Sequence, residues 1–171
     1  MDETGVLVGT DVDAAPSFET FYGAESARLF RALRLVTGDG QEAEEIVQEA
    51  FVRVWERWER VGAMSDPTGY LYRTAMNLYR RAYRRALRSA RRAVRITPTT
   101  DPADAVEARD LFVRWLRNLT PRQRQAVVLT EFTACDIDRA ARVLGIKPGT
   151  VRVLISQARA ALGKITEETD D

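Results

Sequence analysis

The strongest chemical signal in the sequence is a run of arginines. Residues 80–95 hold eight arginines and no acidic residue. Like charges one turn apart on a helix repel each other, so a sequence that keeps several such pairs favours an anionic partner over a merely solvated face. Tyr70, Tyr72, Tyr79 and Tyr83 lie just before or within the run. Rings that stack on bases beside arginines that hold phosphates indicate single-stranded nucleic-acid binding; packing of individual tyrosines in a core is the alternative.

A second set of polar and basic side chains belongs to the segment 136–162. Gly145 predicts a tight turn between two helices, with Asp136 as the cap of the first. In the second helix, apolar residues recur on one face from Val151 to Leu162. Two helices around a short turn predict a DNA-reading helix-turn-helix, and a structural hairpin is the alternative. The candidate contacts on the opposite face are Lys147, Thr150, Arg152, Ser156, Gln157 and Arg159.

The composition excludes several other chemistries. The 171 residues include no histidine and one cysteine, Cys135, which excludes histidine catalysis, an internal disulfide and a cysteine-based zinc site. The sequence has no glycine-rich phosphate loop and no convincing pair of catalytic carboxylates. We therefore expect no enzyme activity, no catalytic residue, no metal and no cofactor. No apolar run is long enough to span a membrane and the N-terminus is acidic, so we expect a cytoplasmic protein without membrane insertion.

Charge is strongly segregated along the chain although the net charge is only +1. Residues 28–95 hold 15 basic and 8 acidic residues, and residues 111–162 hold 9 basic and 3 acidic residues. Acidic segments separate and flank these two blocks, and residues 1–27 hold six acids and no base. Two basic blocks in a nearly neutral chain indicate a polyanionic partner.

The elements that must position these residues are helices. Between residues 41 and 58, apolar side chains recur on one helical face that includes Trp55 and Trp58, and carboxylates cover the opposite face. No stretch alternates with the period of a strand. Ser17 is the expected cap of an earlier helix, and Thr120 begins a capping box in the second half of the chain.

The arginine run belongs to an expected third helix. Ser65 or Asp66 predicts the cap, Pro67 the first turn, and the helix is expected to continue to Arg91. The inward residues of this helix are predicted to be Leu71, Ala75, Leu78, Ala82 and Ala86.

The fold class is therefore all-α, with two small helical domains joined by a flexible linker. The linker is expected in a proline-containing segment without helical period. The boundaries are an acidic mobile tail at 1–17, a first domain at 18–91, the linker at 92–105, a second domain at 106–163 and an acidic tail at 164–171.

Four motifs in order resemble bacterial RNA polymerase sigma factors of the extracytoplasmic-function group. They are AEEIVQEAFVRVW at 43–55, YLYRTAMN at 70–77, LTPRQR at 119–124 and LGIKPGTV at 144–151. The resemblance covers about residues 18–162. It implies a promoter-specificity subunit that binds core RNA polymerase and promoter DNA and itself catalyses nothing. It leaves open an anti-sigma factor as a further partner.

The resemblance also implies roles for individual residues. The domain at 18–91 would be sigma region 2, whose Glu45, Gln48 and Glu49 would dock on the polymerase. The domain at 106–163 would be region 4, whose helix-turn-helix would read the minus-thirty-five element. The residues placed at the melted minus-ten strand or its duplex edge are Tyr70, Arg73, Asn77, Arg80, Arg81, Arg84 and Arg85.

The chain departs from the family pattern mainly in region 4. Arg139 replaces a usual glutamate, and Ser156 and Gln157 stand where histidine and arginine are common. Val153 and Leu154 add apolar surface that could contact thymine methyl groups or a protein. These departures motivate a second hypothesis, a sigma-like adaptor that binds polymerase or a regulator without reading a minus-thirty-five element. A helix-turn-helix repressor, which needs no polymerase-docking helix, is the third.

Overall fold

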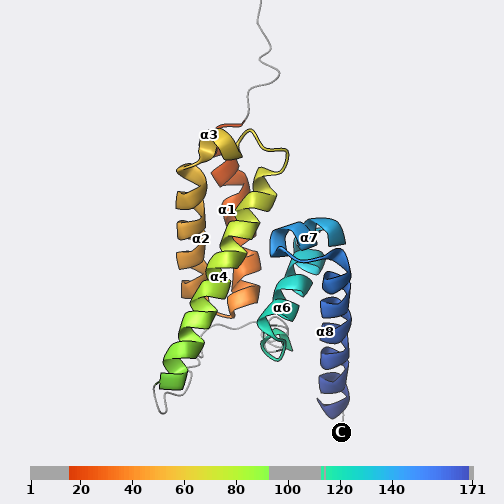
Figure 1. The fold of residues 1–171 in the computed structure, drawn as a ribbon. Helices are drawn as coiled ribbons and strands as arrows, with labels where there is room; N and C mark the ends of the chain where they lie inside the picture. The colour runs from red at the N-terminus through yellow and green to blue at the C-terminus, as the bar shows by residue number, and fades with distance from the viewer. Residues whose placement is uncertain (1–15, 93–112, 114, 170–171) are drawn as a thin grey trace, which may run out of the picture.

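A computed structural model describes residues 16–92, 113 and 115–169, and the side chains of residues 90–92 and 164–169 are not described. The described residues form helices and no strand, which confirms the all-α prediction. The expected N-terminal tail and nearly all of the expected linker lie outside them. Figure 1 shows the elements, which are α1 (Phe18–Thr37), α2 (Gly40–Trp55), α3 (Trp58–Val61), α4 (Pro67–Arg92), α6 (Pro121–Val127), the π-helix η1 (Val128–Phe132), α7 (Ile137–Leu144) and α8 (Pro148–Thr169).

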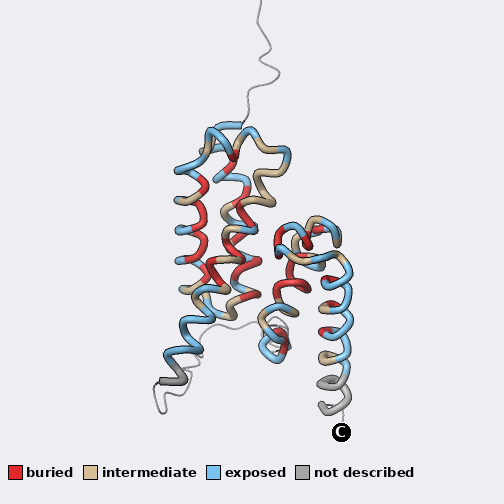
Figure 2. The backbone as a smooth tube through the Cα atoms, in the orientation of Figure 1, coloured by how far each residue is buried: buried red, intermediate tan, exposed pale blue. Residues whose placement is uncertain are grey.

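The first helical unit consists of α1 to α4, and local caps set its helix starts. The Ser17 side chain accepts a hydrogen bond from the Thr20 N–H, and Asp39 accepts one from Glu42. Of the two predicted caps of α4, Asp66 is the one used, because its Oδ1 accepts the Gly69 N–H at 2.8 Å. Figure 2 shows the buried residues on the faces that the long helices turn toward one another. The fully buried side chains here include Leu29, Leu33, Val36, Val54, Leu71 and Met76.

The second unit contains the helix-turn-helix that the sequence predicts. The Thr120 capping box is present, with its side chain and that of Gln123 bonded reciprocally to the backbone. Asp136 caps α7 through the Arg139 N–H at 2.7 Å. Gly145 ends α7 with φ of 67°, a left-handed conformation in which a β-carbon is unfavourable. The core side of α8 is Val151, Ile155 and Ala158.

The two units pack against each other into one continuous core. Helix α7 lies against α4, and α1 contacts α6 and η1. Polar side chains of the second unit also bind main-chain carbonyls of the first. Arg124 donates to the Val36 carbonyl at 2.8 Å, and Arg117 donates to the Gly38 carbonyl at 3.0 Å. The helix-turn-helix is therefore held against region 18–91, an arrangement that the sequence did not predict.

Two expectations about buried faces are wrong. Trp55 is 62 % exposed, because Trp58 of α3 fills the aromatic cluster instead, with ring centroids 4.9 Å from Phe21 and 5.5 Å from Phe18. Ala86, predicted to face inward, is exposed, and Ala82 is only half-buried. The end of α4 extends past the ends of α1 and α2 in Figure 1, and among the described residues no other helix covers its exposed stretch 83–89. Within the described residues, no helix is long and apolar enough to cross a membrane.

Candidate nucleic-acid interface

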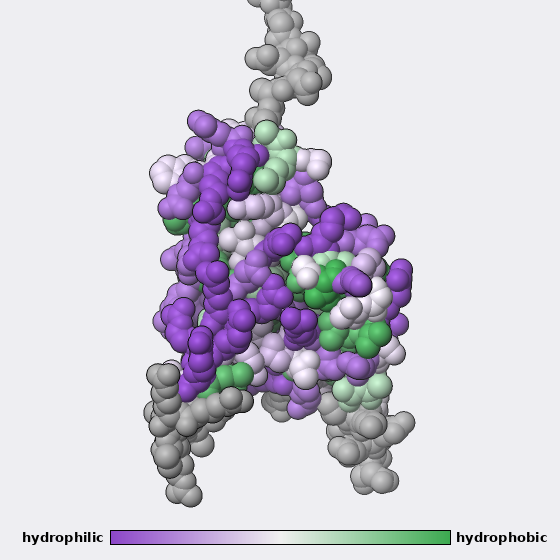
Figure 3. All heavy atoms as spheres, in the orientation of Figure 1, coloured by the Kyte–Doolittle hydropathy of each residue, from purple (hydrophilic) through white to green (hydrophobic). Residues whose placement is uncertain are grey.

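The second half of α4 presents a row of unshielded guanidinium groups. Arg81, Arg84, Arg85 and Arg88 are exposed and line an open groove of about 490 Å³ together with Leu87. Figure 3 shows hydrophilic side chains gathered along the face that carries α4. The nearest bonds of these arginines are internal to the helix: Arg88 Nε donates to the Arg84 carbonyl at 3.2 Å. A row of cations without carboxylate partners on its own helix is suited to a phosphate backbone.

The first half of α4 has different surroundings. Arg73 is exposed, whereas Tyr70, Asn77 and Arg80 are half-buried. Arg80 is hydrogen-bonded to Asn77 Oδ1, and its Nη1 donates to the Leu144 carbonyl of α7 at 3.1 Å. Burial, reinforced by the charges of neighbouring arginines, lowers the pKa of Arg80. The predicted minus-ten residues therefore lie on one helix, but the helix-turn-helix unit already engages one of them.

The tyrosines divide between core and surface. Tyr72 and Tyr79 are buried in the core, and burial raises the pKa of Tyr72 to about 12. Tyr83 is 37 % exposed, with its ring centroid 6.1 Å from that of Tyr79. Tyr70 is half-buried and packs against the core. Of the four tyrosines on α4, Tyr70 and Tyr83 thus keep ring surface that a base could stack on, and for Tyr72 and Tyr79 the packing alternative holds.

Helix α2 offers a second, chemically distinct surface. Glu45, Gln48 and Glu49 are all exposed on one side of it, as the sequence predicts. Glu49 pairs with Arg53 one turn on, at 2.5 Å. Val52 is 52 % exposed, and its position seven residues after Glu45 places it on the same face. The sequence analysis did not predict that Val52 and Trp55 lie on the surface. For Val52 the seven-residue spacing from Glu45 could have predicted it. The face combines carboxylates with apolar area.

Helix α8 carries five of the six predicted minus-thirty-five residues on its exposed side, and Lys147 directly precedes the helix. The helix begins at Pro148, and Val153 in its second turn is 53 % exposed. Gln157 Oε1 accepts a hydrogen bond from Gln123 at 3.3 Å, and Arg159 pairs with Glu131 at 3.1 Å. Both side chains therefore have a partner elsewhere in the second unit. The six predicted residues are all exposed: Lys147, Thr150, Arg152, Ser156, Gln157 and Arg159.

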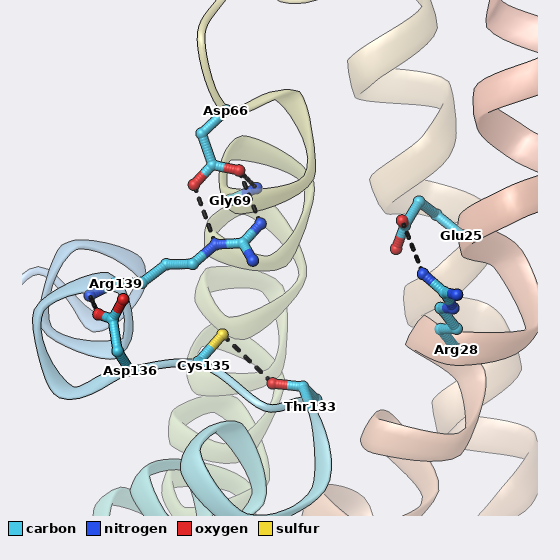
Figure 4. Close-up of polar contacts among 8 residues, drawn as sticks. All are labelled: Glu25, Arg28, Asp66, Gly69, Thr133, Cys135, Asp136 and Arg139. Carbon is cyan, nitrogen blue, oxygen red and sulfur yellow. Dashed lines mark hydrogen bonds and ion pairs between the residues drawn. The ribbon is translucent and has the colours of Figure 1, made fainter.

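An ion pair links the loop before α4 to the helix-turn-helix. Figure 4 shows Arg139 of α7 reaching Asp66 with two hydrogen bonds, Nη2 to Oδ1 at 2.7 Å and Nε to Oδ2 at 3.1 Å. Burial by itself raises the pKa of Asp66, but the bonds from Arg139 and from the Gly69 N–H together outweigh it and leave that pKa below its ordinary value. Hydrogen bonding to Asp66 raises the pKa of Arg139. No local pattern in the sequence joins the two residues, which lie 73 positions apart.

Comparison with known proteins bears on both helical units. Residues 21–89 match the family model of sigma-70 region 2, and residues 109–162 match that of sigma-70 region 4. The RNA polymerase sigma-E factor of Streptomyces avermitilis is 28% identical over 156 residues, which cover 90% of this chain and 87% of that protein. The ECF RNA polymerase sigma factor SigL of Mycobacterium tuberculosis is 28% identical over 167 residues, 94% of each chain.

Solved structures share the fold. The sigma factor RpoE of Bartonella quintana, in complex with the anti-sigma factor NepR, superposes with a TM-score of 0.73 at 20% identity over 88% of this chain and 96% of that one. CnrH, in complex with the cytosolic domain of CnrY, gives a TM-score of 0.63 at 23% identity and 88% coverage of both chains.

Proposed function

The chain belongs to the sigma-70 family, as a sigma factor of the extracytoplasmic-function group, and from that premise we propose that α4 holds the melted minus-ten strand while α8 reads the minus-thirty-five duplex. The protein acts as an alternative sigma factor that binds core RNA polymerase; the polymerase carries out the chemistry. The observation that carries the proposal is the row of exposed arginines along α4, which lacks carboxylate partners on its own helix.

The proposed role of α4 is to bind the melted non-template strand. Arg81, Arg84 and Arg85 hold phosphates of the non-template strand, and Tyr70 offers a partly exposed ring at the start of the helix. Base stacking on an aromatic ring contributes about 1–3 kcal/mol per base, and the phosphate contacts add a salt-dependent, sequence-independent part. Capture of the strand after it leaves the duplex shifts the equilibrium toward the open promoter.

At α2 the proposed work is docking. The exposed Glu45, Gln48 and Glu49 face a basic surface of the polymerase, and Val52 supplies apolar area next to them. Charge complementarity accelerates the encounter, and the desolvated apolar contact slows dissociation. Because α2 and α4 pack against each other, the docking surface and the strand-binding helix move as one body.

At α8 the proposed work is duplex binding in the major groove. The side chains of Thr150 and Arg152, both exposed near the start of α8, bind a backbone phosphate. The exposed Val153 suits a thymine methyl group. Two weak DNA contacts at fixed spacing, one on α4 and one on α8, reinforce each other when both are fixed on polymerase.

Run-off transcription with core polymerase tests the proposal. The variant Arg81→Ala with Arg84→Ala is expected to reduce promoter opening strongly and leave core binding unchanged. The matched control is Arg31→Ala with Arg34→Ala, which removes two exposed arginines of α1. Equal losses of opening and of core binding in the α4 variant, or equal losses in both variants, would contradict the assignment of α4.

A second candidate function rests on α8. Gln157 and Arg159 already have partners in α6 and η1, and Val153 exposes apolar surface instead of charge. A sigma-like adaptor that binds polymerase without reading a minus-thirty-five element would show these features. Arg152→Ala discriminates the two: loss of transcription only on promoters with an intact minus-thirty-five element supports reading, and no loss on any promoter supports the adaptor. The RpoE–NepR complex makes an anti-sigma factor a further expected partner, to be tested by co-purification.

A further inference from the structure

Helix α7 packs against α4, the helix that carries the proposed strand-binding residues. The Asp66 carboxylate, which caps α4, lies within 2.7 Å and 3.1 Å of two nitrogens of Arg139 on α7. A bidentate pair between a carboxylate and a guanidinium is the geometrically specific form of a salt bridge. It ties the loop before α4 to the first helix of the helix-turn-helix, 73 residues away in sequence.

A second contact holds the middle of α4. Arg80, one of the proposed strand-binding residues, donates to the Leu144 carbonyl at 3.1 Å. Leu144 is the last residue of α7, so its carbonyl lies at the negative end of that helix, where a cation is stabilised. In this arrangement Arg80 is half-buried and its donors are partly occupied. A phosphate would have to displace the carbonyl to bind there.

One buried polar atom at this interface lacks a hydrogen-bond partner among the described residues. Gln125 of α6 is fully buried and donates from Nε2 to the Met76 carbonyl of α4 at 3.3 Å. Its Oε1 has no hydrogen-bond partner among the described residues. A buried acceptor without a donor keeps its full cost of desolvation, which is recovered when the two units separate and water reaches it. A permanent core would favour an apolar residue at this position.

Net charge also works against a permanent interface. The segments 28–95 and 111–162 are both basic, with 15 basic against 8 acidic and 9 basic against 3 acidic residues. The charges of Arg122, Arg84 and Arg73 act on the buried Arg80 and lower its pKa. On the side of α7, the cation Arg139 pairs with Asp66 and is also attracted by the charge of Glu25. Phosphates of a DNA strand would offset the repulsion among the arginines around Arg80, and would therefore compete with the closed arrangement.

We propose that the free chain is self-inhibited: α7 covers the start of α4, the Asp66–Arg139 pair latches the two units together, and a strand binds α4 fully only after the latch opens. This inference rests on the proposed strand-binding role of α4. Arg139 would then act within the chain: it would hold the helix-turn-helix against region 2 until DNA binds.

The test uses the full-length free protein and two readouts. The first is Förster transfer between labels at Glu44→Cys on α2 and Ala160→Cys on α8, in a Cys135→Ser background; the two native residues are exposed. The second is the affinity for a labelled oligothymidylate strand. The latch variant is Arg139→Gln. The matched control is Arg142→Gln. Arg142 is an exposed residue of α7 whose charge also acts on Asp66, so the control removes the same charge from the same helix.

We expect Arg139→Gln to lower the transfer efficiency and to raise the affinity for the strand about three- to tenfold, on the scale of a partly exposed bidentate pair. The sign is diagnostic, because loss of a positive charge by itself weakens binding to a polyanion. Arg142→Gln is expected to bind the strand slightly more weakly. Asp66→Asn, whose amide oxygen can still cap α4, should reproduce the Arg139→Gln result, and the double variant should add nothing to it.

Each other outcome overturns the proposal in a distinguishable way. Unchanged transfer in Arg139→Gln would show that the pair is no latch, and would leave the role of α4 intact. Lower transfer with unchanged strand affinity would show that α7 does not mask α4, provided that Arg81→Ala with Arg84→Ala weakens strand binding. If neither the latch variant nor that arginine variant altered strand affinity, the proposed function of α4 would fail as well.

Discussion

The two halves of α4 have opposite surroundings, although they belong to one uninterrupted helix. In the first half, Leu71, Tyr72 and Met76 are buried, and the polar groups of Asp66 and Arg80 have partners in α7. In the second half, arginines stand exposed without a carboxylate on the helix. The comparison leads us to propose two tasks: the covered half would control access to the helix, and the bare half would attract a polyanion.

The largest expected effect is on stability, because the first half of α4 is packed in the core and the second half is not. Leu71→Ala should lower the free energy of unfolding by about 2–5 kcal/mol, because it leaves a cavity in a fully buried site. Leu87→Ala, the same change in the bare half at a residue that is 42 % exposed, should cost less than about 0.5 kcal/mol. Urea unfolding monitored by circular dichroism measures both. Similar losses for the two variants would mean that the second half of α4 is packed in solution.

The next effect concerns attraction in the bare half. Arg81→Ala with Arg84→Ala should weaken oligothymidylate binding on the order of tenfold at low salt, and should reduce the slope of log affinity against log salt by about 0.7 for each phosphate that is no longer neutralised. Anisotropy titrations over a range of salt concentrations measure the slope. The α1 pair Arg31→Ala with Arg34→Ala serves as the control. An unchanged slope in the α4 variant would show that these arginines do not touch phosphates.

A smaller effect is expected at the covered half. Gln125→Met replaces the buried amide by an apolar side chain of similar length and removes the unpartnered Oε1. The closed arrangement should gain up to about 1 kcal/mol, since an unsatisfied acceptor no longer has to be buried. Förster transfer should rise and strand affinity should fall, the reverse of Arg139→Gln. A drop in transfer would show that the hydrogen bond from Gln125 to the Met76 carbonyl stabilises the closed arrangement by more than the unpartnered Oε1 destabilises it.

The smallest effect is expected from pH. Because the pKa of Asp66 in the folded chain is below its ordinary value of about 3.9, its pair with Arg139 stabilises the closed form above about pH 4 and is lost as the pH falls through the lowered pKa. The charges of Arg139 and Arg142 on α7 act on Asp66, and the pKa of Arg139, already high, is raised further by the pair. Transfer should therefore be constant from about pH 8 to about pH 5. A transition inside that range would require another titrating group at the contact.

Much of the fold could be predicted from short sequence patterns that mark the ends of helices. Ser17, Asp66, Thr120 and Asp136 cap helices as predicted, and Gly145 ends α7 in the left-handed conformation. Caps and turns depend on a few neighbouring residues and are therefore visible in sequence. The four motifs likewise identified the family, which the matches at 21–89 and 109–162 confirm. The site residues on α2, α4 and α8 are exposed or half-buried, which leaves their proposed contacts as predictions.

The main helices, most of their polar and apolar faces and the family could be read from the sequence. The exposure of Trp55, the burial of Tyr79 and the bond from Arg139 to Asp66 became visible in the folded chain. The periodicity of a helix says which residues share a face, but the partner that covers a face can come from anywhere in the chain. The contacts between the two units join residues dozens of positions apart, and such pairs are set by packing in space.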